Sequence, residues 1–264
     1  MRTLQALAIT LLLALAAPAQ AERLRVCLGD VANPPYRLAD EQGRLLRKGL
    51  DFVFLDLLAQ RTGVEMEPAF LPAKRCLLEL KNGQLDAVLS ISHVPEREEA
   101  GLYPMRQGQP DASLALRTQR YYWYVLRQTT LQWDGQQLHG LPERTPVGAQ
   151  LGYSIAGVLR EQGYAVDDAV RAVEANVEKL LRGRVAALAL QNSEAEGLLQ
   201  RRPEWALQLR RLEPPLQERP YYLVLGHHLA RSSRLSPAQW WAAMAEVRDS
   251  AEYQRADQAA HPRP

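Results

Sequence analysis

Two cysteines are the residues of this sequence best suited to covalent chemistry. Cys27 and Cys76 stand far apart, and neither belongs to a Cys-x-x-Cys motif or to a cysteine–histidine spacing typical of zinc. The adjacent His227 and His228 would face opposite sides of a strand, so we expect no metal site. The two thiols form a disulfide in an oxidising compartment, or otherwise remain buried as small apolar groups.

The first 21 residues have the pattern of a secretory signal peptide. Arg2 gives a positive start, residues 4–17 form a short apolar run, and Ala19-Gln20-Ala21 fits the cleavage rule. This run is too short for a membrane-spanning helix, and no second apolar stretch of spanning length follows. We therefore expect an exported, soluble protein that is cleaved after Ala21.

The charge distribution does not favour nucleic acid as a partner. The net charge is +2, and basic residues are interspersed with acidic ones. The pairs Arg201-Arg202 and Arg210-Arg211 are isolated, and Glu204 and Glu213 follow them closely. No continuous basic surface of the kind that binds phosphate backbones is expected.

A short unit occurs twice, one hundred positions apart, in residues 77–89 and 177–189. The units share four positions: Leu80/Leu180, Gly83/Gly183, Leu85/Val185 and Ala87/Ala187. Each unit is typical of the end of an amphipathic helix, a glycine stop and a buried strand. Two such units predict two related α/β lobes, with a cleft between them for a small molecule.

The remaining pattern supports this architecture. Strands and helices alternate in the first half (24–28, 49–60, 64–67, 72–81, 85–92) and again in the second (146–150, 154–162, 165–166, 176–182, 185–190). This order predicts a mostly parallel sheet in each lobe. In the first lobe the start of the second helix can pass over the first strand, so we expect a Cys27–Cys76 disulfide. The tail, residues 236–255, predicts one helix that packs on the first lobe through four apolar positions: Trp240, Trp241, Met244 and Val247.

Several short motifs follow one another along most of the chain: Pro34-Pro35-Tyr36, Gly43, Gly49-Leu50-Asp51, Gly83-x-x-Asp86-Ala87, Pro95-Glu96-Arg97, Tyr103-Pro104, Val147-Gly148, Gly152-Tyr153-Ser154, Gly183-Arg184-Val185, Tyr221-Tyr222 and Ser250-Ala251-Glu252-Tyr253. In their order and spacing they resemble the family 3 extracellular solute-binding proteins, the periplasmic receptors of amino-acid importers. Residues 72–77 are similar to a Pro-x-Lys-Arg-Cys-Leu subgroup of that family.

The resemblance implies an α/β, two-lobe (type II) periplasmic binding protein with a central ligand cleft. Extended aromatic stretches at residues 121–127 and 219–225 are the expected hinge crossings. The expected organisation is a signal peptide (1–21), the first part of lobe 1 (22–120), lobe 2 (121–218), and a return to lobe 1 with the C-terminal helix (219–264).

The resemblance also implies a set of ligand-binding residues. Arg97 matches the arginine that holds an amino-acid carboxylate, and a planar guanidinium suits that task; the alternative is a surface arginine within an acidic cluster. Ser90 and Ser92 precede it at the cleft end of a strand. Tyr153 and Ser154 lie at a helix N-terminus, where free N–H groups favour an anion; Ser154 could also be a plain helix cap, and the two roles can hold at once.

Several positions depart from the family pattern. Gln191 stands where such receptors have an acid for the α-ammonium group, and Asn33 and Ala73 fall where aromatic clamps are expected. Tyr36 and Tyr153 could supply aromatic surface instead, and Arg75 is a second candidate cation. The set favours a carboxylate-bearing solute, whether amino-acid-like or an organic acid without an amine.

The function expected from the resemblance is solute capture for an ABC-type importer, with a membrane permease as partner. We expect a monomeric periplasmic protein that performs no catalysis and needs no metal or cofactor. One alternative is an enzyme on the same scaffold, similar to cyclohexadienyl dehydratase, for which His93 and Glu96 are the nearest acid–base candidates. Another is a ligand-sensing module without transport, because fold alone does not determine function.

Overall fold

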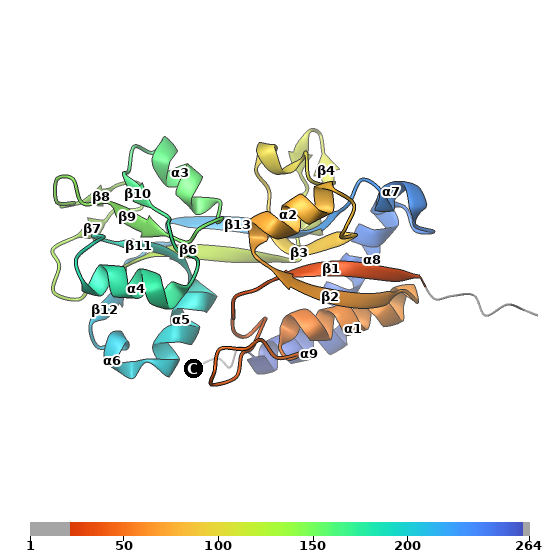
Figure 1. Cartoon of the computed structure of the whole chain (residues 1–264), viewed down its shortest axis with the longest axis horizontal. Helices are drawn as coiled ribbons and strands as arrows, with labels where there is room; N and C mark the ends of the chain where they lie inside the picture. The colour runs from red at the N-terminus through yellow and green to blue at the C-terminus, as the bar shows by residue number, and fades with distance from the viewer. Residues whose placement is uncertain (1–21, 261–264) are drawn as a thin grey trace, which may run out of the picture.

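The computed structural model describes residues 22–260, so the predicted signal peptide lies outside the described residues (Figure 1). A nine-stranded sheet runs through both lobes in the order β10-β9-β11-β6-β13-β3-β1-β2, and β12 pairs with β6. Its strands are β1 (Arg23–Gly29), β2 (Glu65–Leu71), β3 (Ala87–Ser92), β6 (Arg117–Leu126), β9 (Val147–Ala149), β10 (Val166–Asp167), β11 (Leu188–Gln191), β12 (Leu209–Arg211) and β13 (Gln217–Leu225). Two small hairpins lie outside it: β4 (Met105–Arg106) with β5 (Gln109–Pro110), and β7 (Gln132–Trp133) with β8 (Leu138–His139).

Helices cover both faces of the sheet in each lobe (Figure 1). In the first lobe α1 (Leu50–Thr62), α8 (Pro237–Asp249) and α9 (Ala251–Ala260) lie on one face, and α2 (Ala73–Lys81) lies on the other. In the second lobe α3 (Ile155–Glu161) lies opposite α4 (Val173–Leu181) and α5 (Asn192–Arg201). The shorter helices are η1 (Pro95–Arg97), η2 (Ala112–Leu114), α6 (Pro203–Ala206) and α7 (Leu229–Ser232).

The alternation of side chains in β1 explains how one strand serves two cores. Leu24, Val26 and Leu28 point into the core under α1 and α8, whereas Cys27 joins the core under α2. Parallel pairing of β1 with β2 and with β3 matches the predicted α/β arrangement. The predicted α/β, two-lobe fold is therefore confirmed for the described residues.

The internal repeat corresponds to equivalent structures in the two lobes. Gly83 and Gly183 follow α2 and α4 with φ values of 72° and 67°, a left-handed conformation that glycine adopts without steric cost. Each glycine N–H bonds the carbonyl three residues earlier, at Leu80 and at Leu180. Both leucines are 1 % exposed. The repeat therefore encodes the same helix stop and the same entry into a buried strand.

Two long strands connect the lobes. β6 and β13 pair with each other antiparallel between Arg117–Tyr121 and Gln217–Tyr221. Beyond this crossing, β13 continues beside β3 of the first lobe and β6 continues beside β11 of the second. The boundaries predicted at residues 121 and 219 fall inside these two strands, and the division at those residues remains a prediction.

Cys27 and Cys76 form a disulfide in the structure, with their Cα atoms 5.8 Å apart. The bond lies in the core between β1 and the first turns of α2, as the strand order predicts. Both residues are almost fully buried. The disulfide thus links β1 covalently to α2, the helix that follows the second strand.

The C-terminal segment differs from the single helix that its periodicity predicts. Ser250 is extended, with ψ of 149°, and divides the segment into α8 and α9. Its hydroxyl accepts the N–H of Tyr253 in the first turn of α9, as a helix cap does. The packing prediction is confirmed, because all four predicted positions, Trp240, Trp241, Met244 and Val247, belong to the first-lobe core. Among the described residues, no helix is long and apolar enough to cross a membrane.

Candidate functional site

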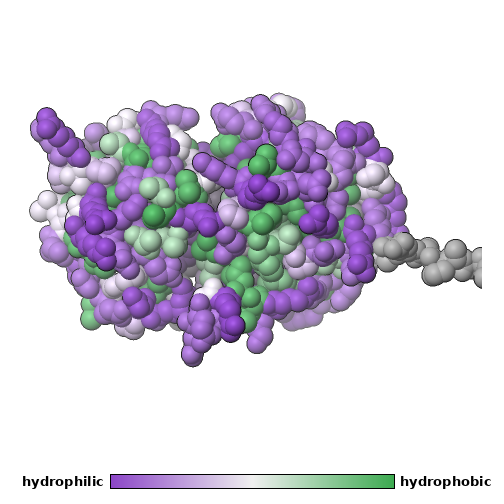
Figure 2. Space-filling view, viewed as in Figure 1, coloured by the Kyte–Doolittle hydropathy of each residue, from purple (hydrophilic) through white to green (hydrophobic). Residues whose placement is uncertain are grey.

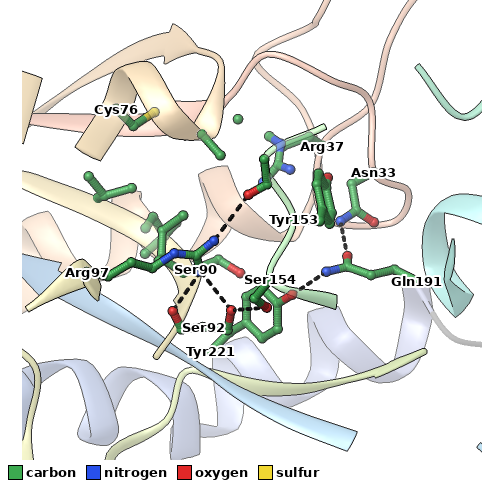
Figure 3. Close-up of a pocket in the computed structure, with 16 residues that line it drawn as sticks. Asn33, Arg37, Cys76, Ser90, Ser92, Arg97, Tyr153, Ser154, Gln191 and Tyr221 are labelled. Atoms are coloured by element: carbon green, nitrogen blue, oxygen red, sulfur yellow. Dashed lines mark hydrogen bonds between the residues drawn. The ribbon is translucent and has the colours of Figure 1, made fainter. Parts of the chain in front are cut away.

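A cavity of about 60 Å³ lies where the two lobes meet. Figure 2, in the same view as Figure 1, shows mostly hydrophilic side chains on the surface and a notch between the lobes. The cavity is lined from the first lobe by Gly29, Asn33, Arg37, Ala73, Cys76, Val88, Leu89, Ser90, Ile91, Ser92 and Arg97, and from the second lobe and the crossing strand by Gly152, Tyr153, Ser154, Gln191 and Tyr221 (Figure 3). Six of the eight predicted ligand-binding residues therefore lie together.

Arg97 is placed at the cavity by η1, directly after the strand that carries Ser92. Its Nη1 donates to the carbonyl oxygen of Ser92 at 2.8 Å and to the Ser92 hydroxyl at 2.9 Å. Its Nη2 donates to the carbonyl oxygen of Gly152 in the other lobe at 3.1 Å (Figure 3). All three acceptors are neutral, so these bonds leave the positive charge of the guanidinium without a carboxylate partner.

Ser90 occupies a β-bulge at the end of β3. Its φ is 65°, which is uncommon for a residue with a side chain, and the pairing of β3 with β13 shifts register beside it. The Ser90 hydroxyl accepts from Arg117 Nε at 3.0 Å. The bulge thus turns the last residues of the strand toward the cavity and couples them to a buried arginine.

The second lobe meets the first through the turn before α3. The hydroxyls of Ser154 and Ser92 lie 3.0 Å apart (Figure 3). Ser154 occupies the N-cap position of α3, but its side chain makes no capping hydrogen bond. Tyr153 lines the cavity with its ring, and its hydroxyl donates to Glu194 at 2.6 Å.

Gln191 is the centre of a buried hydrogen-bond network at the end of β11. Its Nε2 donates to the hydroxyls of Tyr221 at 2.6 Å and Tyr121 at 3.0 Å. Its Oε1 accepts from Asn33 Nδ2 at 3.4 Å, across the interface between the lobes. Burial raises the pKa of the Tyr221 hydroxyl, so that hydroxyl remains protonated at neutral pH.

Two predicted residues do not line this cavity. Arg75 lies on the exposed side of α2 and pairs with Glu79 one turn further along. Tyr36 packs against the first-lobe core, with the guanidinium of Arg117 stacked 3.8 Å from its ring centre. In both cases the neighbouring residue, Cys76 or Arg37, faces the cavity instead.

Arg37 is the main site residue that sequence reasoning missed. It is 7 % exposed, and its Nη1 donates to Asp51 at 2.6 Å. Asp51 is fully buried and also pairs with Arg117. Burial raises the pKa of Asp51, but the two guanidinium groups outweigh it and hold that pKa below its usual value. Two motifs of the sequence point to this pair, because Arg37 directly follows Pro34-Pro35-Tyr36 and Asp51 ends Gly49-Leu50-Asp51.

Glu194 is a buried acid behind the cavity wall. Its carboxylate accepts from the Tyr153 hydroxyl and from Gln150 Nε2, both at 2.6 Å. Burial raises its pKa, and these hydrogen bonds offset only part of the effect. Glu194 does not line the cavity, so Tyr153 separates it from a ligand there.

The site is suited to binding an anion. Among the described residues that line the cavity, two are arginines and none is an Asp, Glu, His or Lys. His93 lies outside the cavity, where it pairs with Glu98 and packs on Tyr103. Within residues 22–260, no cluster of His, Cys, Asp and Glu side chains could hold a metal ion.

Comparisons with known proteins support the fold. No protein-family model and no curated protein sequence matches the chain. Among solved structures, the arginine-, lysine-, histidine-binding protein ArtJ from Geobacillus stearothermophilus has a TM-score of 0.70 at 16 % identity, over 92 % of this chain and 96 % of that one. The fold is that of a two-lobe periplasmic binding protein.

Other structures with this periplasmic-binding-protein fold have different roles. The GluR0 ligand-binding core from Nostoc punctiforme, solved with L-glutamate, has a TM-score of 0.65 at 18 % identity, over 89 % of this chain and 98 % of that one. A histidine kinase sensor domain has a TM-score of 0.70 at 16 % identity, over 90 % and 96 %. At such identities the similarity establishes the fold, and the function must be argued from the site.

Proposed function

We propose that this chain is an exported periplasmic solute-binding protein that captures a small carboxylate-bearing solute. The observation that carries the proposal is the inter-lobe cavity, which two arginines line and no carboxylate lines among the described residues. A guanidinium binds a carboxylate with two parallel hydrogen bonds. Gln191 supplies an amide where an amino-acid receptor would need an acid, so the solute need not carry an amine.

Closure of the two lobes is the proposed response to binding. β6 and β13 are the only strands of the main sheet that pair across the two lobes in the described residues, and they suit a hinge. In the structure the lobes already touch through Arg97 and Gly152 and through Ser92 and Ser154. A solute held by both lobes would favour this closed state, which the permease of an ABC-type importer would recognise. We further propose a monomer with lobe boundaries near residues 121 and 219.

A sensing role is the second candidate, and one observation favours it. A histidine kinase sensor domain shares this fold over most of its length. A binding site of the same chemistry would serve either role. Genes for a permease and an ATPase beside the gene for this chain would favour transport, whereas a kinase or cyclase gene would favour sensing.

Catalysis is less well supported by the site. An enzyme related to dehydratases would need a general acid or base that reaches the ligand. His93 pairs with Glu98 outside the cavity, and Glu96 is exposed. The hydroxyl of Tyr153 is already committed to Glu194. We therefore propose binding without chemical conversion of the solute.

A thermal-shift screen against amino acids, organic acids and peptidoglycan fragments tests the proposal. A ligand that binds only the native state raises the melting temperature by mass action. We expect compounds with a free carboxylate to raise it, and their esters or amides to have no effect. A rise with cationic or neutral solutes alone would contradict the proposal.

A further inference from the structure

The position of Arg37 places a second guanidinium at the cavity wall. Its Nε donates to the carbonyl oxygen of Val31 at 3.3 Å, and its Nη1 is bound to Asp51. Its Nη2 lies beside Gly29, where a methyl group on the glycine would approach it to 3.2 Å. In the described part of the chain Nη2 donates to no protein acceptor. The missing side chain at position 29 therefore leaves this donor room at the cavity wall.

The buried group formed by Arg37, Asp51 and Arg117 has more positive than negative charge. Asp51 carries one negative charge and is shared between Arg37 and Arg117, so the three buried groups have a net charge of +1. The ring of Tyr36 stacks on Arg117 but carries no charge at neutral pH. A buried charge without a partner is costly, so this group favours an additional anion.

Arg97 adds a second positive charge without a carboxylate partner, on the same cavity (Figure 3). The buried acid Glu194 lies behind the cavity wall, and its oxygens accept hydrogen bonds from Tyr153 and Gln150. Arg37, Arg97 and Arg117 together with Asp51 therefore carry a net charge of +2 beside the cavity.

We propose that Arg37 is a second anion anchor and that the cavity takes a short solute with two anionic groups, of the dicarboxylate class. One carboxylate binds Arg97 and the other binds Arg37 Nη2. The cavity is small, about 60 Å³, which favours a short chain. This inference depends on the proposed function, since it specifies the solute of the same site.

Calorimetry with matched acids tests the inference. The probes are malonate, succinate and glutarate, each compared with the monocarboxylate of equal chain length: propanoate, butanoate and pentanoate. We expect at least one dicarboxylate to bind about tenfold or more tightly than its partner, as a second charged contact would provide. In Arg37→Gln this ratio should fall toward one. Arg23→Gln is the matched control, because Arg23 is exposed and pairs with Glu65 away from the cavity, and it should keep the ratio.

The outcomes separate the inference from the proposed function. Equal binding of mono- and dicarboxylates, or a ratio that persists in Arg37→Gln, overturns the second anchor and leaves carboxylate binding intact. Failure of every acid to bind overturns both. If Arg37→Gln does not fold, Gly29→Ala keeps the charge but crowds Nη2, and the ratio should fall there as well. An unchanged ratio in Gly29→Ala would also overturn the inference.

Discussion

Arg97 and Gly152 join the two lobes directly, through a hydrogen bond of 3.1 Å from the guanidinium to the carbonyl oxygen. The residue that we assign to the solute carboxylate therefore also holds the closed state. A carboxylate bound to the same guanidinium would add a charged acceptor beside these neutral ones, and charged hydrogen bonds are the stronger kind. The proposed function therefore couples binding and closure through the single side chain of Arg97.

Replacement of Arg97 by alanine should abolish detectable solute binding while the protein remains folded. Loss of one partner of a buried, hydrogen-bonded charge pair weakens binding by about 2–5 kcal/mol. Calorimetry measures the affinity, and circular dichroism checks the fold. Arg75→Ala is the matched control, because Arg75 is exposed on α2 and should leave binding intact. Unchanged affinity in Arg97→Ala would remove Arg97 from the site.

The solute should not need an α-ammonium group. The described residues that line the cavity include no acid, and Gln191 is already bonded to two tyrosine hydroxyls. Glutarate should therefore bind at least as tightly as glutamate in parallel calorimetric titrations. Binding of glutamate alone would mean that an acid such as Glu194 reaches the ligand in the bound state.

The Cys27–Cys76 bond should stabilise the first lobe substantially. It closes a loop of 49 residues, for which the chain-entropy relation gives about 4 kcal/mol. The double variant Cys27→Ala/Cys76→Ala should melt about 8–16 °C lower in a protein of this size. Thiol titration of the denatured, unreduced protein should find no free thiol, and two free thiols per chain would rule the bond out.

Glu194 should make stability depend on pH above its usual pKa of 4.5. Because burial raises its pKa in the folded state, Glu194 is protonated to a greater extent in the native protein than in the unfolded chain in this window. The free energy of unfolding then falls as pH rises from about 4.5 through the raised folded value. Glu194→Gln keeps an acceptor for Tyr153 and should lose this slope.

Thermal melts between pH 4 and pH 8 measure the effect. Glu178→Gln is the control, because Glu178 is a half-exposed acid in a surface ion pair and should leave the slope in place. Parallel profiles for the wild type and Glu194→Gln would show that Glu194 has an ordinary pKa.

The sequence is sufficient to predict features that depend on local patterns. Gly83 and Gly183 each end a helix by adopting a left-handed backbone conformation. In β1, the alternation of side-chain direction places Cys27 in one core and Leu24 and Val26 in the other. Both signals arise from backbone geometry and burial, which act over a few residues. The α/β order, the disulfide and the two lobes follow from them.

The side of a loop or helix that faces the cavity is harder to predict. Tyr36 and Arg37 are neighbours, but Arg37 faces the cavity because the buried Asp51 holds it, and Asp51 comes from α1. Arg75 likewise turns outward, because the disulfide fixes Cys76 inward on α2. Such orientations depend on contacts between distant segments, which no short pattern in this chain records.

A pair of solutes with opposite charge gives the most direct test of the central claim, that the closed cleft binds an anion. Glutarate and 1,5-diaminopentane have the same five-carbon chain but carry two negative or two positive charges. Calorimetric titration of the purified protein at neutral pH should give saturable binding of glutarate and none of the diamine. Binding of the diamine without glutarate would contradict the assignment of Arg97 and Arg37 to the solute.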